Sequence, residues 1–343
     1  MRKAFKCQKI VLLFGLVSCS LSANAEIIKP SPLKVGDTIV IVAPAGPLAD
    51  QGKFLRGVKE LEEAGFKIKV DPQVYFRDGY FAGSDQQRAE ALQRAFEDPE
   101  AKAVFCAKGG YGSARLLSLL DLDKMAKSGK MFVGYSDITA LHLALNKRGL
   151  ATIHGLMPAL LNGFKTSWVR ESFFNLLKGD AKVPENAPVG EVLVSGTAIA
   201  PVVGGCLRLI TDSLGTPNEM DFAGKILLLE DTGEKPYRID AMLTHLLNAN
   251  KIQKCAGIVI GDLSHGVPEK SKPSTDPNVR TWRDIVKDRL SGLGIPIMVN
   301  YPFGHISNVL SLPLGVSARL DADKGTLTFL ESACKEDSEN RSL

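Results

Sequence analysis

The feature that most constrains the fold is a regular alternation of short apolar runs with segments of helical periodicity, beginning at Leu33. The run 38–43 is apolar and largely β-branched, which is typical of a strand buried on both faces, and Pro44 and Gly46 end it. Apolar residues at helical spacing follow over 54–64. Short strands that alternate with helices predict an α/β fold around a parallel sheet.

The alternation continues far enough to predict two domains. A chain of 343 residues has room for two hydrophobic cores. We expect an N-terminal domain over 33–165 and a smaller C-terminal α/β domain over 196–330. Between them, 166–195 has a weak pattern and a polar, proline-bearing stretch, so we expect a linker. The charged residues 331–343 are expected to form a frayed tail.

The first 25 residues predict an export signal. Basic residues are followed by the apolar run 10–17 and the small-residue stretch 22–25, so we expect cleavage after Ala25. The apolar run is too short to span a bilayer, and no later run is apolar enough to do so. Residues 16–19 also resemble a bacterial lipobox, which would make Cys19 a lipid anchor. Either route predicts an exported, periplasmic protein.

The balance of charge argues against a nucleic-acid partner. The chain has 42 Lys and Arg against 38 Asp and Glu. Four of the basic residues lie in the leader, which leaves 38 of each sign in the mature chain. A nucleic-acid-binding protein is expected to carry a basic surplus and a basic patch.

The cysteines and histidines predict no metal site. Cys106, Cys206, Cys255 and Cys334 are scattered without C-x-x-C spacing, and no pair of histidines has the spacing of a zinc motif. Export would permit one or two disulfides, whereas the apolar surroundings of Cys106 and Cys255 favour buried thiols. We expect no metal and no cofactor.

Ser136 lies in a strand-to-helix turn, Gly134-Tyr135-Ser136-Asp137, after the predicted strand 131–134. Such an elbow lifts a hydroxyl above the carboxyl end of a parallel sheet, where binding and catalytic residues gather. The match to G-x-S-x-G is partial because the fifth residue is Ile138. Taken alone, Ser136 therefore fits a helix N-cap as well as a nucleophile.

Two further segments follow predicted strands in the second half of the chain. Glu230 and Asp231 come directly after the strand 225–229, and an acid there can either orient a histidine or cap a turn. His305 lies in a glycine-bearing loop after the strand 295–299 and is free to face a cleft. His142 and His245 lie on helical segments and are expected to be packing or surface residues, while His154 and His265 are weaker loop candidates.

The glycine-rich turn 108–112 lets backbone N–H groups approach a ligand closely. It matches neither phosphate-binding glycine motif. It is therefore either a plain tight turn or part of an oxyanion hole shared with the elbow at Ser136.

Seven short motifs together resemble the LD-carboxypeptidases, a family of serine peptidases that act as muramoyltetrapeptide carboxypeptidases. The resemblance covers residues 33–330, and the motifs occur in the family's order: 42–47, 108–112, 134–137, 154–155, 204–205, 228–231 and 303–305. It implies a flavodoxin-like N-terminal domain that carries the nucleophile and a C-terminal domain that carries the other two catalytic residues. It also implies a homodimer.

The resemblance implies a Ser-Glu-His triad of Ser136, Glu230 and His305, which releases the terminal D-alanine of a murein tetrapeptide. His305 would take the proton of Ser136 while Glu230 holds the imidazole. Backbone N–H groups of Gly110 and Asp137 would bind the oxyanion. For the substrate carboxylate, Arg115 and Arg208 are candidates, although either side chain can equally be structural.

Two other functions stay open. Some members of the family cleave peptide-nucleotide antibiotics and confer self-immunity, so an immunity hydrolase is the nearest alternative. Two α/β domains behind a signal peptide also fit an exported solute-binding protein without chemistry.

Overall fold

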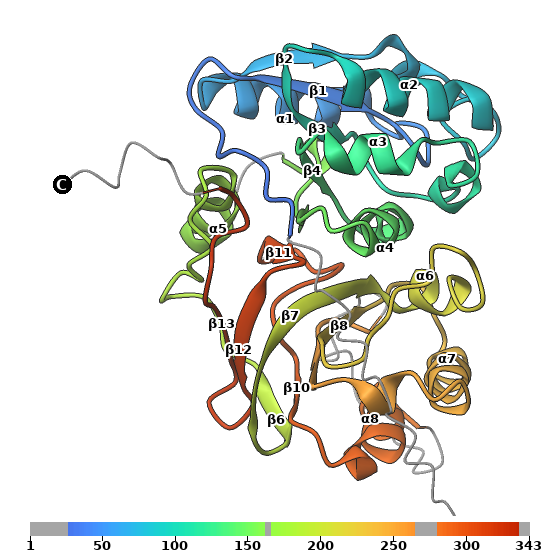
Figure 1. The fold of residues 1–343 in the computed structure, drawn as a ribbon, viewed down its shortest axis with the longest axis vertical. Helices are drawn as coiled ribbons and strands as arrows, with labels where there is room; N and C mark the ends of the chain where they lie inside the picture. The colour runs from blue at the N-terminus through green and yellow to red at the C-terminus, as the bar shows by residue number, and fades with distance from the viewer. Residues whose placement is uncertain (1–26, 162–165, 265–279, 336–343) are drawn as a thin grey trace, which may run out of the picture.

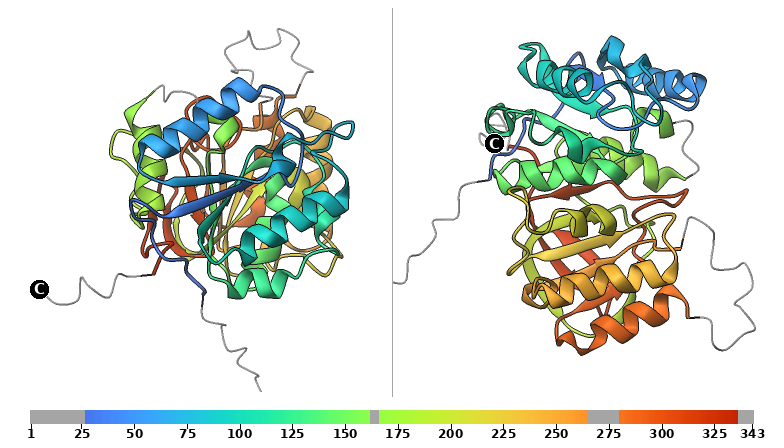
Figure 2. Two further views of the ribbon diagram at one scale, coloured as in Figure 1. Left: turned by 90° about the horizontal axis from the view of Figure 1, so that it is seen from above. Right: turned by 90° about the vertical axis from the view of Figure 1, so that its right-hand side faces the viewer.

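Two α/β domains lie one above the other in the computed structural model, which describes residues 27–161, 166–264 and 280–335 (Figures 1 and 2). The first half of the chain forms the upper domain of Figure 1 and most of the second half forms the lower one. The leader 1–25 with Cys19, most of the tail and nearly all of the polar loop after Ser264 lie outside the described residues. None of the helices in the described part is long and apolar enough to cross a membrane.

The sheet of the N-terminal domain has the strand order β11-β5-β4-β3-β1-β2. Strands β1 to β5 pair in parallel and lie side by side in the order β2-β1-β3-β4-β5. This is the flavodoxin-like order, which confirms the predicted fold class. These strands are β1 (Thr38–Val42), β2 (Lys67–Val70), β3 (Ala101–Cys106), β4 (Met131–Gly134) and β5 (Thr152–His154).

Helices cover both faces of this sheet. Residues of α1 (Gln51–Glu63) and α5 (Ser167–Leu177) pack on one face, and those of α2 (Asp85–Glu97), α3 (Leu122–Lys127) and α4 (Thr139–Lys147) on the other. The sequence sets two of the helix starts. The Asp50 side chain accepts from the backbone N–H of Lys53, and Ser84 forms a capping box with Gln87.

The sheet of the C-terminal domain has the order β13-β12-β7-β8-β9-β10-β6. Its centre, from β7 to β10, is parallel, and the outer strands pair antiparallel. The strands are β6 (Glu191–Val194), β7 (Thr197–Cys206), β8 (Ile226–Glu230), β9 (Gly257–Ile260), β10 (Ile297–Val299), β12 (Ser317–Asp321) and β13 (Thr326–Phe329). One face packs on α6 (Leu207–Asp212), α7 (Pro236–Asn248) and α8 (Trp282–Leu290).

The segment 166–195, expected to be a linker, contains two packed elements. Helix α5 buries Trp168 and Phe173 in the core, and β6 pairs with β10. Only the polar stretch between them runs as a loop with turns. The helix lies directly before a polar stretch with prolines, and a sequence window that spans both shows little helical periodicity.

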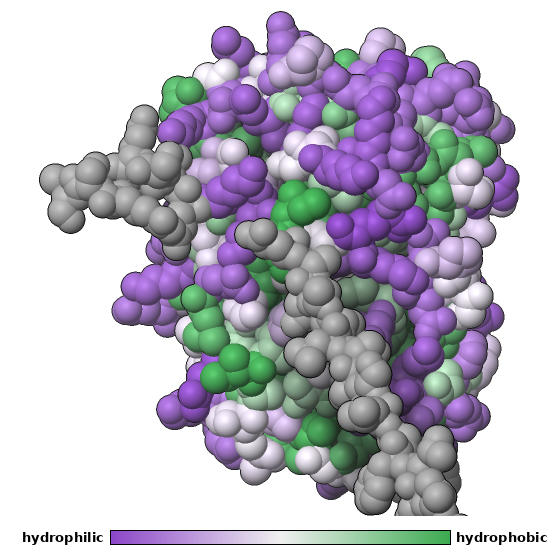
Figure 3. Space-filling view, viewed as in Figure 1, coloured by the Kyte–Doolittle hydropathy of each residue, from purple (hydrophilic) through white to green (hydrophobic). Residues whose placement is uncertain are grey.

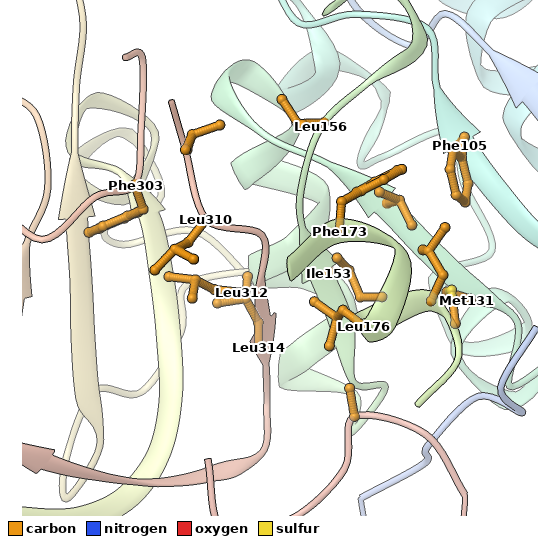
Figure 4. Packing of buried hydrophobic residues seen from close by; sticks show 14 of the residues in the cluster. Phe105, Met131, Ile153, Leu156, Phe173, Leu176, Phe303, Leu310, Leu312 and Leu314 are labelled. Carbon is orange, nitrogen blue, oxygen red and sulfur yellow. The ribbon is translucent and has the colours of Figure 1, made fainter. Parts of the chain in front are cut away.

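A strand from the second half of the chain joins the first sheet. Strand β11 (Leu312–Leu314) pairs antiparallel with β5. Its leucines belong to an apolar cluster that runs from one domain into the other (Figure 4). In that view the labelled Phe303 and Leu310 lie beside β11, and Ile153 and Leu176 lie on its other side. The two domains therefore share one continuous core.

The described start of the tail is packed. Cys334 is buried, and Ser332 donates to the carbonyl of Gly179.

Cys106, Cys206, Cys255 and Cys334 are all free thiols and all buried, as their apolar surroundings favour. Hydrophilic residues prevail over the N-terminal domain on the face shown in Figure 3.

Candidate active site

Ser136 follows β4 in a sharp turn that leads into α4. Its φ of 67° lies in the left-handed region, which is rare for a residue with a side chain. Such strain persists only where the surroundings enforce it, and it is typical of a nucleophile elbow. The Gly109 backbone passes so close that a Cβ there would lie 2.8 Å from the Cβ of Ser136. The sequence is compatible with either a helix N-cap or a nucleophile elbow at Ser136, and the structure shows a strained elbow.

The structure brings Ser136, His305 and Glu230 together at the junction of the two domains. The hydroxyl of Ser136 lies 2.9 Å from Nε2 of His305 and donates to it when the imidazole proton is on Nδ1. His305 Nδ1 then donates to Oε2 of Glu230, at 2.6 Å. Gly304 permits this approach: its φ is 103°, and a Cβ there would lie 2.8 Å from the Cβ of Glu230.

The pKa values of Glu230 and His305 are shifted in opposite directions by burial and by neighbouring charges. Glu230 is completely buried at the end of β8; burial raises its pKa, but contacts with His154 and His305 outweigh this and hold it at about 2. Burial lowers the pKa of His305, and the carboxylates of Glu230, Asp231 and Asp262 outweigh this and raise it above 6.5. Glu230 is thus a carboxylate at neutral pH, poised to stabilise an imidazolium at His305.

Ser136 lines a pocket of about 290 Å³ between the domains. Asp231 lies in its wall and accepts from the backbone N–H groups of Arg208 (2.8 Å) and Thr232 (2.7 Å). Burial raises the pKa of Asp231 to about 6. The lining residues are Gly110, Tyr111, Ser136, Asp137, Cys206, Arg208, Leu209, Asp212, Asp231, Thr232 and Glu234.

Gly110 and Asp137, whose N–H groups were predicted to bind an oxyanion, both line this pocket with Ser136. Gly110 has a φ of 126°, so the turn there needs glycine. The carboxylate of Asp137 accepts from the backbone N–H groups of Gly112 (3.2 Å) and Ser113 (2.8 Å). These bonds tie the glycine-rich turn to the elbow and fix their relative position.

The two arginine candidates differ in position. Arg208 lines the pocket, bonded to Asp212 at 2.9 Å, with Glu234 at 3.7 Å. Arg115 pairs with Asp85 and lies over the ring of Phe81, and it is not among the lining residues. Of these two arginines, Arg208 is the one that lines the pocket beside Ser136.

Three of the remaining histidines lie in regular elements, and His265 falls outside the described residues. His142 is buried in α4, bonded to the carbonyl of Gly134 and to Thr152, and His245 is in α7. Sequence reasoning undervalued His154, which is the buried last residue of β5 with its Nε2 3.9 Å from Oε1 of Glu230. The available signal was its place at the carboxyl end of the strand beside β4. Within the described ranges, no group of three or more His, Cys, Asp or Glu side chains is arranged to hold a metal ion.

A serine that is hydrogen-bonded to a histidine, which in turn is hydrogen-bonded to an acid, is the arrangement of a serine hydrolase. The comparisons narrow that class. Residues 39–155 match the LD-carboxypeptidase N-terminal domain and residues 200–320 match the LD-carboxypeptidase C-terminal domain. The chain belongs to this family, peptidase S66, which confirms the resemblance seen in the sequence and makes the protein a serine-type hydrolase.

Three relatives illustrate the family. A Bacillus subtilis protein named "Probable murein peptide carboxypeptidase" is 36% identical over 303 residues, 87% of this chain and 93% of its own. The microcin C7 self-immunity protein MccF of Escherichia coli is 27% identical over 340 residues, 88% of this chain and 95% of its own. The crystal structure of muramoyltetrapeptide carboxypeptidase from Oxalobacter formigenes superposes with a TM-score of 0.71 at 29% identity, covering 85% of this chain and 97% of that one.

Proposed function

We propose that this protein is a serine carboxypeptidase that releases the terminal D-alanine from murein tetrapeptides, with Ser136 as nucleophile. The observation that carries the proposal is the unbroken hydrogen-bonded series from Ser136 through His305 to Glu230, at 2.9 and 2.6 Å. The names of two relatives, a murein peptide and a muramoyltetrapeptide carboxypeptidase, support the substrate.

In acylation, His305 Nε2 takes the proton of Ser136 as Oγ attacks the carbonyl of the L-residue that precedes D-alanine. Glu230 stabilises the imidazolium so formed. The same proton passes from His305 to the nitrogen of D-alanine as the C–N bond breaks, and D-alanine leaves. Water then attacks the acyl-enzyme, again giving its proton to His305, and the tripeptide is released as Ser136 recovers its proton.

The tetrahedral intermediates need donors for their oxyanion. The backbone N–H groups of Gly110 and Asp137 serve as these donors, since both residues border the pocket beside Ser136. Loss of one such donor costs about 3 kcal/mol in other serine peptidases. The bonds of Asp137 to Gly112 and Ser113 place both donors before substrate arrives.

A carboxypeptidase also has to recognise a free terminal carboxylate. Arg208 is the arginine that lines the pocket, and its guanidinium is about half exposed. We assign it to the carboxylate of D-alanine, for which it would exchange part of its contact with Asp212.

The test is mass spectrometry of defined murein tetrapeptides incubated with the full protein. We expect loss of one alanine from the tetrapeptide and none from the tripeptide product. Ser136→Ala should abolish the loss, whereas Ser118→Ala, at an exposed serine of the same domain outside this pocket, should retain it. Intact tetrapeptide with folded wild-type protein would refute the proposed substrate.

The similarity to MccF favours one second candidate, hydrolysis of a peptide-nucleotide antibiotic. The same assay with an aminoacyl-nucleotide analogue distinguishes the two, because only this candidate predicts faster turnover of the nucleotide. The non-catalytic solute-binding alternative is set aside because the chain belongs to a peptidase family.

The proposed site of action is the periplasm, on the basis of the leader over 1–25. Cell fractionation with and without the leader tests this, and Cys19→Ser distinguishes lipidation from simple cleavage. The homodimer stays a prediction, which light scattering of the purified mature chain measures directly.

A further inference from the structure

Glu230 uses only one of its two carboxylate oxygens in the series described above. Oε1 has no hydrogen-bond partner among the residues that the structure describes, although the side chain is completely buried. The same holds for both ring nitrogens of His154, which is 1% exposed. A buried polar atom without a partner is costly, and a buried carboxylate oxygen particularly so.

These unpaired atoms face one another. His154 Nε2 lies 3.9 Å from Oε1 of Glu230, about 1 Å beyond hydrogen-bond distance. His154 ends β5 in register with Gly134 of β4, so it lies beside the elbow on the same edge of the sheet. Its ring packs against the rings of Tyr135 (5.4 Å between centroids) and Phe303 (5.8 Å), which hold it in this orientation.

We propose that His154 is a positioning residue: a shift of about 1 Å lets its Nε2–H donate to Oε1 of Glu230, and this bond holds Oε2 against His305. The inference rests on the proposed function only in requiring that Ser136, His305 and Glu230 act as one unit. It does not depend on which substrate the enzyme takes.

A carboxylate held through a single oxygen can rotate about its Cγ–Cδ bond and lose its alignment. A second donor on the other oxygen stops that rotation, as partner groups do for the histidines of metal sites. Donors on both oxygens also stabilise the ionised form of the carboxylate. The Nδ1 proton of His305 then stays on the imidazole and does not pass to Glu230, while the Nε2 proton is free to move to the leaving group.

The groups around His305 determine how its pKa should change when His154 can no longer donate to Glu230. The groups that face His305 are Glu230, Asp231 and Asp262, which raise its pKa, and the ring of Tyr135 on the side of the first domain. Among the causes that raise the pKa of His305, the hydrogen bond that it donates to Glu230 is the largest. If Glu230 loses its fixed orientation, the pKa of His305 should fall back toward the ordinary histidine value.

The experiment compares three variants of the full chain. His154→Leu removes every donor at similar size. His154→Gln keeps an amide N–H at the position of Nε2, and His154→Asn places its amide nearer Nδ1. The matched control is His142→Leu, since His142 is a buried histidine in the neighbouring helix, 6.5 Å from His154 between ring centroids, and bonds only to Gly134 and Thr152.

The readout is the rate at which a fluorophosphonate acylates Ser136, followed by intact mass and measured across pH. In that reaction the Oγ–P bond forms, fluoride leaves, and His305 takes the serine proton. We expect His154→Leu and His154→Asn to react roughly 10- to 100-fold more slowly than wild type, as for the loss of a hydrogen bond to a charged group. The acid limb of their pH–rate profile, which is the fall in labelling rate at low pH, should move to lower pH.

His154→Gln should recover most of the rate and the wild-type acid limb. His142→Leu should lower the melting temperature and leave the acid limb in place. A packing role alone would slow the Gln and Leu variants equally without moving the limb, and that result overturns the proposal. If the Leu variant does not fold, the Gln and Asn pair decides by the same criterion.

A measurement on the unmodified protein stands beside the variants. Nitrogen-15 NMR of labelled histidines should show a proton on Nε2 of His154, and a proton on Nδ1 alone overturns the proposal. Because the probe reaction needs no murein, an unreactive wild-type Ser136 would indicate failure of the proposed triad, whereas a reactive one that leaves tetrapeptide intact would indicate the wrong substrate.

Discussion

The alanine variant of Gly109 tests whether the position of Ser136 limits the reaction. The backbone of Gly109 is not in the left-handed region, so alanine meets no conformational penalty there. The new Cβ would instead lie 2.8 Å from the Cβ and 3.1 Å from the Oγ of Ser136. Ordinary contact between such carbons begins at about 3.5 Å, so the two segments must separate by about 0.7 Å.

That displacement is large compared with the tolerance of the site. The hydroxyl of Ser136 is 2.9 Å from His305 Nε2, and a shift of this size lengthens the bond beyond hydrogen-bond range. A misplacement of about 1 Å at reacting atoms costs on the order of 100-fold in rate. We therefore expect the rate of fluorophosphonate labelling of Ser136 to fall by about 100-fold, while overpacking lowers the free energy of unfolding by about 1–3 kcal/mol.

The assay combines fluorophosphonate labelling of Ser136 with urea unfolding. Gly292→Ala is the matched control, because a Cβ at Gly292 has no neighbour within 4 Å and its backbone is equally permissive. We expect the control to keep full reactivity. A Gly109→Ala variant that is as stable and as reactive as the control would refute the claim that this turn fixes the nucleophile.

Three further predictions concern the proposed catalytic residues. Ser136→Gly should abolish turnover and raise the melting temperature slightly, measured calorimetrically, because glycine adopts the φ of 67° without strain. The acid limb of kcat/KM should lie above pH 6.5, since the pKa of His305 is raised and its neutral form is the base, so activity is lost as pH falls through that pKa. Arg208→Gln should raise KM for tetrapeptide at least tenfold and leave the rate of fluorophosphonate labelling within about threefold, because that reagent carries no carboxylate.

The strand-end rule selected, from the sequence alone, three of the residues that the structure brings together at the candidate site. Ser136 lies two residues after β4, Glu230 is the last residue of β8, and His305 lies in the loop that follows β10. His154 obeys the same rule but ends a strand of only three residues. A run of three residues carries little apolar signal in the sequence. The importance of His154 follows from the position of β5 beside β4, which the sequence alone does not give.

Other features depend on contacts that are distant in sequence. Strand β11 is three residues long with a central proline, which normally argues against a strand. It is tolerated because β11 lies at the edge of the first sheet, where Pro313 needs no donor on its outer side. The left-handed backbone of Ser136 is likewise imposed by the surrounding turn, and no local pattern predicts it.

The division of the site between two domains explains why the shared core matters for chemistry. Ser136 belongs to the N-terminal domain, whereas Glu230 and His305 belong to the second half of the chain, so the bond from Ser136 to His305 crosses the junction. Strand β11 follows His305 within a few residues and pairs with β5, whose last residue is His154. Any sliding of one domain on the other would therefore have to break a sheet and an apolar cluster before it could separate Ser136 from His305.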